Sequence, residues 1–319
     1  MKVKTSGDST KAMENRKFSI FDAIGNTPLV ELKNLNGNPR VKILGKLEGS
    51  NPGGSVKDRP AYYMIIKAEE SGKLTKDKTI VEPTSGNMGI ALAMIGAAKG
   101  YRVKLFMPEC VSTERQRTLA ALGAEVMLTP ADEGTDGAIT RARQTFAEEP
   151  DKYYMPNQFD NDANVLAHYV TTGPEILSQT NGEVDIFVAG MGTTGTLMGT
   201  GKYLKEKRPS VKIIAVEPTV GHTIQGLKNM KESIVPKIYH PEIFDEKVVV
   251  EDEEAFETTR LLAVKEGLFV GMSSGAAAAG ALHVAKNLNS GTIVVILPDR
   301  GDRYLSTTLF RSFCAKCPP

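Results

Sequence analysis

The chain has 319 residues, of which 41% are hydrophobic and 24% charged, and 39 basic side chains balance 38 acidic ones to a net charge of +1. This balance argues against a surface for nucleic acid or membranes, and no apolar stretch is long enough to span a bilayer. A single hydrophobic core rarely grows beyond this length. The composition therefore predicts a soluble protein of two domains, with no nucleic-acid or membrane partner.

The two ends of the chain and its few cysteines suggest no binding site. Residues 1–16 are polar, and residues 313–319 hold Cys314 and Cys317, which with Cys110 are the only cysteines. Two thiols cannot fill a structural zinc site, and the four histidines have no metal-ligand spacing. We therefore expect flexible tails, no bound metal, and the reducing environment of the cytoplasm, where disulfides are rare.

Between these ends, short runs of Val, Ile, Leu and Phe alternate with longer amphipathic stretches. Helices are expected over 55–71, 86–99 and 112–122, and a glycine follows each one, as is common just past a helix C-terminus. Such alternation predicts an α/β fold with mostly parallel strands. The expected strands are 41–46, 79–82, 102–107, 125–128, 185–189, 212–216 and 292–297.

Ligands in α/β folds bind at the carboxyl ends of strands, where the next helix begins. The first such junction is 51–59, a Pro-Gly-Gly turn that places Lys57 in the first turn of a helix. The positive end of a helix dipole disfavours a protonated lysine, and a neutral amine can attack an aldehyde. From this segment alone, a solvated surface lysine remains the simpler interpretation.

The second junction, 82–89, follows directly on a predicted strand. Thr84, Ser85 and Asn87 supply hydroxyl and amide groups beside backbone N–H donors. This combination is typical of a turn that binds a carboxylate. An ordinary helix cap explains the same residues equally well.

The third junction, 190–196, combines three glycines with Thr193, Thr194 and Thr196 before a helix. Open backbone N–H groups, hydroxyls and a positive helix end together predict a phosphate cradle. Its Gly-x-Gly-x-x-Gly spacing is also the dinucleotide fingerprint, and Glu217 ends the next strand where an acidic ribose ligand belongs. A nicotinamide-dependent oxidoreductase is therefore an alternative, although it leaves Lys57 and the 82–89 turn without a role.

Two further segments follow. In 271–277, Ser273 could hydrogen-bond the nitrogen of a ring, or simply begin a helix of small residues. The polar loop 297–305 comes after the last apolar strand. It could close a site or only turn the chain.

Taken in order from 24–29 to 303–307, these motifs resemble the cysteine synthase family, fold type II of the enzymes that use pyridoxal 5′-phosphate (PLP). Segments 192–201 and 301–306 look most like its cysteine synthase B (O-acetylserine sulfhydrylase) branch. The resemblance implies a tryptophan synthase β-like fold of two domains with twisted, mostly parallel sheets flanked by helices. Residues 44–160 would form a smaller, mobile domain carrying the carboxylate loop, and 17–43 plus 161–312 a larger one carrying the phosphate loop.

The resemblance also implies roles for individual residues. Lys57 would form the Schiff base with PLP and move the substrate's Cα proton, Asn87 would bond the ring hydroxyl, and Ser273 would face the pyridine nitrogen. The phosphate would be held by Gly192, Thr193, Thr194, Gly195 and Thr196. The substrate carboxylate would be bound by Thr84, Ser85, Gly86, Met88 and Gln158.

The implied reaction is β-replacement of O-acetyl-L-serine or O-phospho-L-serine by sulfide, through an aminoacrylate, to give L-cysteine in a homodimeric transferase. Two residues depart from the family pattern. Met88 stands where threonine is usual, and Thr219 where members using O-phosphoserine tend to carry arginine, which favours O-acetylserine. Another PLP β-replacement enzyme, a serine dehydratase and a non-catalytic scaffold remain alternatives.

Overall fold

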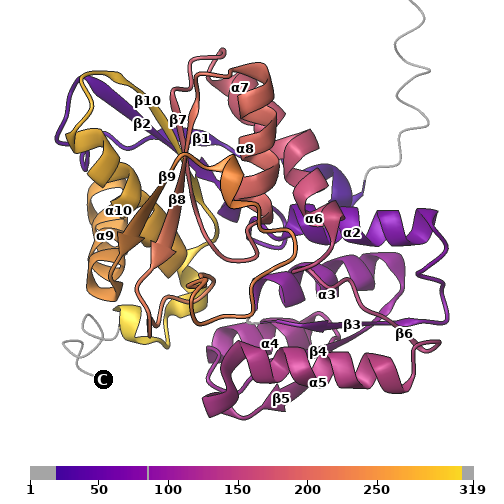
Figure 1. Cartoon of the computed structure of the whole chain (residues 1–319). Coiled ribbons are helices and arrows are strands. Elements are labelled where there is room, and N and C mark those ends of the chain that lie inside the picture. Colours follow the sequence, from indigo (N-terminus) through magenta and orange to yellow (C-terminus); the bar gives the residue numbers. More distant parts are fainter. Residues whose placement is uncertain (1–18, 85, 311–319) are drawn as a thin grey trace, which may run out of the picture.

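The computed structural model describes residues 19–84 and 86–310, which form two sheets (Figure 1). In the six-stranded sheet the strand order is β1-β2-β10-β7-β8-β9, and every neighbouring pair is parallel except β1 with β2. Its strands are β1 (Leu29–Glu31), β2 (Val41–Leu47), β7 (Ile186–Gly190), β8 (Lys212–Pro218), β9 (Glu246–Val250) and β10 (Gly291–Leu297).

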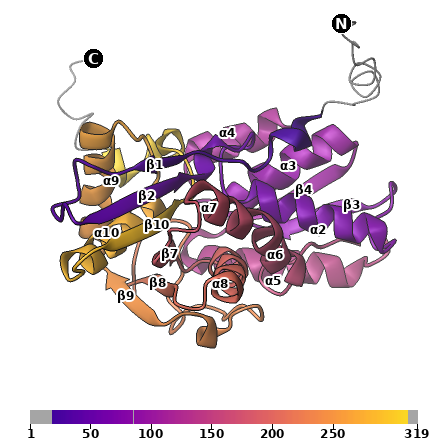
Figure 2. The ribbon, with the colours of Figure 1, turned by 90° about the horizontal axis from the view of Figure 1, so that it is seen from above.

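The four-stranded sheet is parallel throughout, in the order β5-β4-β3-β6. Seen from above, the two sheets and their helices lie side by side (Figure 2). The strands of the four-stranded sheet are β3 (Thr79–Pro83), β4 (Arg102–Pro108), β5 (Glu125–Thr129) and β6 (Tyr153–Tyr154).

Helices cover both faces of each sheet. α9 and α10 share a core with one face of the six-stranded sheet, and α7 and α8 with the other. In the four-stranded sheet, α2, α3 and α4 pack on one face and α5 on the other. The helices are α2 (Asp58–Glu70), α3 (Asn87–Lys99), α4 (Thr113–Ala121), α5 (Gly134–Glu148), α6 (Asp162–Ala167), α7 (Gly173–Gln179), α8 (Gly195–Lys207), α9 (Asp252–Glu266) and α10 (Met272–Lys286).

The predicted α/β class is confirmed, and each of the seven predicted strands is present with its ends within two residues. The three predicted helices begin later than expected. In particular, Lys57 is the N-cap of α2 and not part of its first turn, because Ser55, two residues before it, is held outside the helix by a β-bridge with Asp299. β1, β6 and β9 were not predicted.

The chain passes from the first sheet to the second after β2 and returns after β6. The domain limits at residues 44 and 160 stay a prediction. Within the described residues, no helix is long and apolar enough to cross a membrane. The tails expected at 1–16 and 313–319, with Cys314 and Cys317, lie outside the part of the chain that the structure describes.

Candidate functional site

A cavity of about 660 Å³ receives residues from both sheets. Its wall is formed largely by the segments that follow β3, β4, β5, β7 and β8, at the carboxyl ends of these strands. Gly86 and Gly195 lie behind the wall, and Ser85 is outside the described residues. The other predicted site residues all line the cavity: Lys57, Thr84, Asn87, Met88, Gln158, Gly192, Thr193, Thr194, Thr196 and Ser273.

Lys57 reaches this cavity from the start of α2, where its backbone N–H donates to Ser55 Oγ at 3.2 Å. Burial lowers the pKa of Lys57 to about 8, and the negative charge of Asp299 opposes that shift. Because the ordinary value is 10.5, a sizeable fraction of this amine is neutral near physiological pH. A neutral amine is the form that reacts with a carbonyl group.

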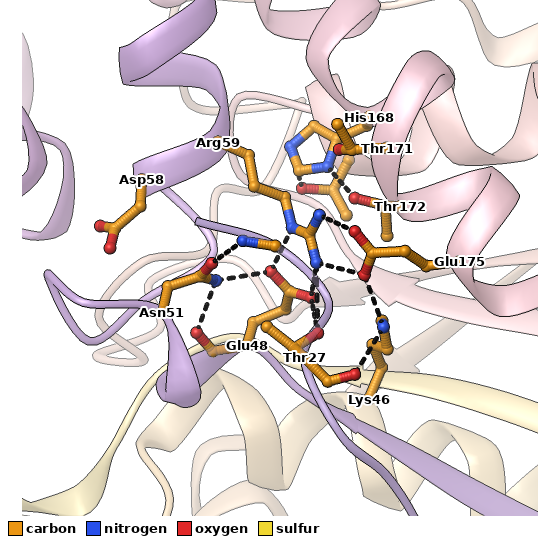
Figure 3. Close-up of polar contacts among 12 residues, drawn as sticks. Thr27, Lys46, Glu48, Asn51, Asp58, Arg59, His168, Thr171, Thr172 and Glu175 are labelled. Atoms are coloured by element: carbon orange, nitrogen blue, oxygen red, sulfur yellow. Dashed lines mark hydrogen bonds and ion pairs between the residues drawn. The ribbon is translucent and has the colours of Figure 1, made fainter. Parts of the chain in front are cut away.

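The helix that follows Lys57 is anchored by a cluster of four charges, here called the Arg59 cluster: Lys46, Glu48 and Arg59, which are buried, and Glu175, which is partly buried (Figure 3). Arg59 donates from Nε to Glu48 at 2.8 Å and from Nη1 to Glu175 at 2.6 Å, and Lys46 Nζ donates to Glu175 at 2.7 Å. Burial alone would raise the pKa of Glu48, but the charge and hydrogen bonds of Arg59 hold it below its ordinary value. The first turn of α2 is thus fixed to α7 and to the end of β2.

The turn after β3 is organised by Thr84. Its Oγ1 accepts from the backbone N–H groups of Gly86 at 2.9 Å and Gly89 at 3.1 Å. Gly86 has φ of +142°, and a Cβ there would collide with the side chain of Arg115. The glycine is therefore required by both backbone conformation and space. Met88 is 2% exposed and adds an apolar surface to the cavity.

Gln158 enters the cavity from the segment after β6, where a buried carboxylate holds it. Glu82 accepts from the backbone N–H groups of Asn157 at 2.7 Å and Gln158 at 2.9 Å. The Gln158 side chain also donates to Pro83 O at 3.1 Å. Burial raises the pKa of Glu82 to about 7, although the two backbone hydrogen bonds oppose the shift.

The loop between β7 and α8 forms a cradle at the helix N-terminus. Thr194, the N-cap, has φ of +70°, and its buried Oγ1 has no hydrogen-bond partner among the described residues. A Cβ on Gly192 would meet Gly226 O at 2.5 Å, and one on Gly195 would collide with Asn164. The N–H groups of a first helical turn have no partner within the helix. The cradle therefore offers donors and a compact shape suited to a phosphate.

Two hydroxyl groups of this cradle are held from α6 and the π-helical turn η4 (His168–Thr172). Thr193 Oγ1 accepts from Asn164 Nδ2 at 3.2 Å, and Thr196 Oγ1 lies 3.2 Å from His168 Nε2. Burial lowers the pKa of His168 well below its ordinary value. The imidazole is therefore neutral and contributes no charge to the cradle.

Ser273 and Asn87 complete the wall. Ser273 is 4% exposed in the first turn of α10. The Asn87 side chain donates from Nδ2 to Asp299 at 2.6 Å and accepts at Oδ1 from Arg303 at 2.5 Å. Asp299 also accepts a hydrogen bond from Tyr304 at 2.7 Å. The 297–305 loop thus reaches the cavity wall from behind.

Several residues of the site were not singled out from the sequence. Asp299 and Arg303 had a signal, since they lie in the polar 297–305 loop. Glu82 preceded a recognised turn, but nothing marked it as a partner of Gln158. Asn164 and His168 lie within helical segments far from any strand end in the sequence, so no local pattern identifies them.

Glu217, the acidic residue required by the nicotinamide alternative, is 2% exposed and engaged elsewhere. Its Oε1 accepts from Met230 N at 2.9 Å and its Oε2 pairs with Lys247 at 2.7 Å. Among the residues that the structure describes, no group of three or more His, Cys, Asp or Glu could hold a metal ion. The donor set instead fits PLP, with an amine of lowered pKa, an anion cradle and two polar side chains around one cavity.

Comparison with known proteins agrees with this fit. A family model described as pyridoxal-phosphate dependent enzyme matches residues 20–299. Cysteine synthase B of Salmonella typhimurium is 46% identical over 292 residues, which cover 92% of this chain and 96% of the relative. The match decides between the two cofactors in favour of PLP.

Solved structures give the same result. The crystal structure of a cysteine synthase from Entamoeba histolytica has a TM-score of 0.87 and 40% identity, and the match covers 98% of this chain and 94% of that chain. An O-ureido-L-serine synthase has a TM-score of 0.87 and 40% identity, with 92% and 95% covered. The chain therefore belongs to the cysteine synthase family of pyridoxal-phosphate dependent enzymes.

Proposed function

We propose that this chain is a cysteine synthase that replaces the β-substituent of O-acetyl-L-serine by sulfide. One observation carries the proposal. The amine of Lys57, with a pKa of about 8, shares a single cavity with the cradle before α8 and the Thr84 turn. Bound PLP supplies an electron sink that weakens the bonds at the α- and β-carbons of an amino-acid substrate.

The residues around the cofactor would divide the remaining work. Lys57 would hold PLP covalently and move the proton of the substrate's α-carbon. Asn87 would donate to the ring hydroxyl, and Ser273 would face the ring nitrogen with a hydroxyl, which leaves that nitrogen largely unprotonated. The phosphate would be bound by Gly192, Thr193, Thr194, Gly195 and Thr196.

The turn after β3 would bind the substrate carboxylate. Thr84 holds the N–H groups of Gly86 and Gly89 through its Oγ1, and the helix N-terminus that follows attracts an anion. Met88 contributes no hydroxyl, so backbone donors would bind more of the carboxylate. The proposed set for this role is Thr84, Ser85, Gly86, Met88 and Gln158.

The charges lining the cavity favour a neutral ester over a phosphorylated one. Lys228 lies 3.5 Å from Asp136, and Arg115 Nη2 lies 3.8 Å from Asp299. Both cations are thus already opposite carboxylates, and Asp132, Glu133 and Glu232 also line the cavity. A dianionic phosphate would meet net negative charge here.

The test compares the two donors directly. Purified protein should be yellow, and O-acetylserine should change its visible spectrum faster than O-phosphoserine at equal concentration. Sulfide should then release cysteine. A faster response to O-phosphoserine would contradict the donor assignment, and a colourless native protein would contradict the proposal as a whole.

A second candidate, another PLP β-replacement reaction, is favoured by the O-ureido-L-serine synthase match at 40% identity. Product analysis with sulfide and with thiosulfate measures which nucleophile is accepted. Serine given alone tests for dehydratase activity, which would yield pyruvate.

We further infer that the protein is a cytoplasmic homodimer whose smaller domain, 44–160, moves toward the larger one when substrate binds. The dimer follows from the family resemblance, and the exposed thiol of Cys110 suits a reducing compartment. Light scattering of the holoprotein should give twice the mass of one chain. A monomer at micromolar concentration would contradict the inference.

A further inference from the structure

The segment after β10, residues 298–304 (here the 298–304 loop), stands behind the cavity wall. We propose that Asp299 and Arg303 of this loop are positioning residues that fix the orientation of the Asn87 carboxamide, so that its NH₂ group is the edge available to the cofactor. The proposal rests on the role proposed above for Asn87 toward PLP.

The argument begins with donors and acceptors. Arg303 Nη1 donates to Asn87 Oδ1 at 2.5 Å, and Asn87 Nδ2 donates to Asp299 Oδ2 at 2.6 Å. A guanidinium can only donate and a carboxylate can only accept. Turning the amide over would place NH₂ against the guanidinium and oxygen against the carboxylate, and would lose two charge-assisted hydrogen bonds. Only one orientation is therefore stable.

This orientation leaves one hydrogen of Asn87 Nδ2 unused by Asp299. The amide oxygen, by contrast, is already occupied by Arg303. An amide whose free edge is a donor suits an oxygen acceptor such as the ring hydroxyl of PLP in its ionised form. If the amide were turned over, its oxygen would face the ionised ring oxygen of PLP, and the two oxygens would repel each other.

The carboxylate itself is held in place. Asp299 is 0% exposed, and its Oδ2 also accepts from the Tyr304 hydroxyl at 2.7 Å. Burial raises the pKa of Tyr304, so this hydroxyl keeps its proton and can only donate to the carboxylate. Arg115 Nη2, 3.8 Å from Asp299 Oδ2, adds a favourable charge.

Arg303 connects this arrangement to the turn that carries Lys57. Its Nη2 donates to Gly53 O, and a Cβ on Gly54 would collide with the same guanidinium. Within the same loop, Pro298 O accepts from Val56 N at 2.8 Å. The 298–304 loop therefore holds two groups of the site, Lys57 and Asn87, which come from different segments, in a fixed relation.

The same loop provides matched controls. Arg300 and Asp302 pair with each other at 2.7 Å, with side chains 58% and 44% exposed. Neither lines the cavity. Arg300→Lys and Asp302→Asn thus make the same chemical changes as Arg303→Lys and Asp299→Asn on the solvent side of the loop.

The experiment is a double-mutant cycle on PLP binding. PLP is titrated into apoprotein of the wild type, Asn87→Ala, Asp299→Asn, Arg303→Lys and the doubles with Asn87→Ala, and thermal unfolding of each apoprotein is recorded. We expect Asp299→Asn and Arg303→Lys to weaken PLP binding about tenfold, from losing a hydrogen bond to a charged group. In the Asn87→Ala background, Asp299→Asn should weaken PLP binding further by less than about twofold. The PLP affinities of the two controls, Arg300→Lys and Asp302→Asn, should match that of the wild type within about twofold.

The outcomes separate the two proposals. If Asn87→Ala leaves PLP affinity and the visible spectrum of the bound cofactor unchanged, the role proposed for Asn87 is wrong. If Asn87→Ala weakens binding but Asp299→Asn has the same effect with and without Asn87, the two residues do not act through the amide and the inference is overturned. Should one of the two variants fail to fold as apoprotein, the cycle with the other decides.

Discussion

At the scale of single residues, burial moves the pKa of two ionisable side chains toward neutrality from opposite directions. Lys57, in the cavity wall, falls to about 8, and Glu82, behind the wall, rises to about 7. Within residues 19–84 and 86–310, neither side chain forms a salt bridge. Their protonation near neutral pH is therefore governed mainly by loss of water, which disfavours the charged form of each.

The pKa of Lys57 predicts how apoprotein takes up PLP as pH changes. Only the neutral amine reacts, so the rate of uptake should rise about tenfold per pH unit below pH 8 and level off above it. Stopped-flow absorbance measures this rate, and Nα-acetyl-lysine serves as a reference amine. A profile that climbs through about pH 10, as for a free lysine, would show that burial does not lower this pKa.

For Glu82 the prediction concerns stability. Its folded-state pKa of about 7 lies above the ordinary 4.5, so the folded protein holds the proton more tightly than the unfolded chain. The contribution of Glu82 to stability is therefore fully present below about pH 4.5 and lost as pH rises through about 7. The free energy of unfolding of the wild type relative to Glu82→Gln should fall by about 2–3 kcal/mol over this range.

Urea denaturation of the two apoproteins at a series of pH values checks this difference. Glu70→Gln is the matched control, because Glu70 is 60% exposed and forms an exposed i,i+3 pair with Lys67. If the Glu82→Gln difference stays flat from pH 4 to pH 8, Glu82 does not titrate as proposed. Because Glu82 holds Gln158, the variant should also raise KM for the amino-acid ester more than it lowers kcat.

At the scale of elements, the N-terminal ends of α2 and α8 place the amine of Lys57 and the hydroxyl groups of the cradle, and each end is held by buried side chains. The Arg59 cluster fixes α2, and Asn164 supports the start of α8 by donating from Nδ2 to Thr193 Oγ1 and, at 2.8 Å, to Gln158 O. A single amide thus links the proposed phosphate cradle to Gln158 of the proposed carboxylate site. Substitutions that displace these supports should act on binding without touching the ligands themselves.

Removing Arg59 should cost much more than removing a surface cation. Arg59→Met leaves Glu48 buried without its main partner, and breaking such a pair costs about 3–5 kcal/mol. Lys67→Met, in the exposed pair with Glu70, should change the free energy of unfolding by less than about 1 kcal/mol. Chemical denaturation measures both, and equal losses in the two variants would contradict a structural role for the cluster.

Gly195→Ala should damage the cradle through Asn164. The added Cβ collides with the Asn164 side chain, and overpacking of this kind costs about 1–3 kcal/mol. PLP affinity should fall, while Gly37→Ala, with no atom within 4 Å of its added Cβ, should leave it unchanged. Titration of the two apoproteins gives the comparison, and unchanged affinity in Gly195→Ala would show that the cradle tolerates displacement of Asn164.

What the sequence predicts well is what depends on local pattern. Strands such as β10, whose last five residues are all apolar and buried, give continuous apolar runs that identify them. β9 has only its last residue buried, and β6 has two residues, so neither stands out. The loops at strand ends were found from their glycines and hydroxyls, whereas contacts such as Arg303 with Asn87, 216 residues apart, have no local signature.

At the scale of the whole molecule, the cavity lies where the two sheets meet, and several contacts cross it. Lys228 approaches Asp136 at 3.5 Å, Arg115 donates to Gln225, and Ser112 Oγ donates to Arg303 O at 2.8 Å. These contacts join α4 and the start of α5 to segments of the six-stranded side. Two of them, Lys228 with Asp136 and Arg115 with Gln225, are only partly buried, so movement of α4 and the start of α5 relative to the six-stranded side should be easier than movement at the Arg59 cluster.

Substrate binding should therefore be visible in amide hydrogen exchange of the holoprotein. We expect O-acetylserine to slow exchange in residues 131–136 and 222–228, which face each other across the cavity, because ligand-induced closure excludes water. Residues 256–262 of α9 lie away from it and serve as an internal reference. Equal exchange with and without the ester at a saturating concentration would argue against closure.

The place of β10 in the six-stranded sheet has a consequence for how the protein is made. It pairs with β2 on one side and β7 on the other, yet it follows every other strand of the described residues in the sequence. On the ribosome, β2 and β7 have no strand between them until residue 297 has been synthesised. Domains tend to fold as units during synthesis, so this sheet cannot be completed before β10 has been synthesised. Until then, nascent chains would expose the unpaired edges of β2 and β7. Exposed strand edges promote aggregation, so we expect nascent chains of this protein to bind chaperones.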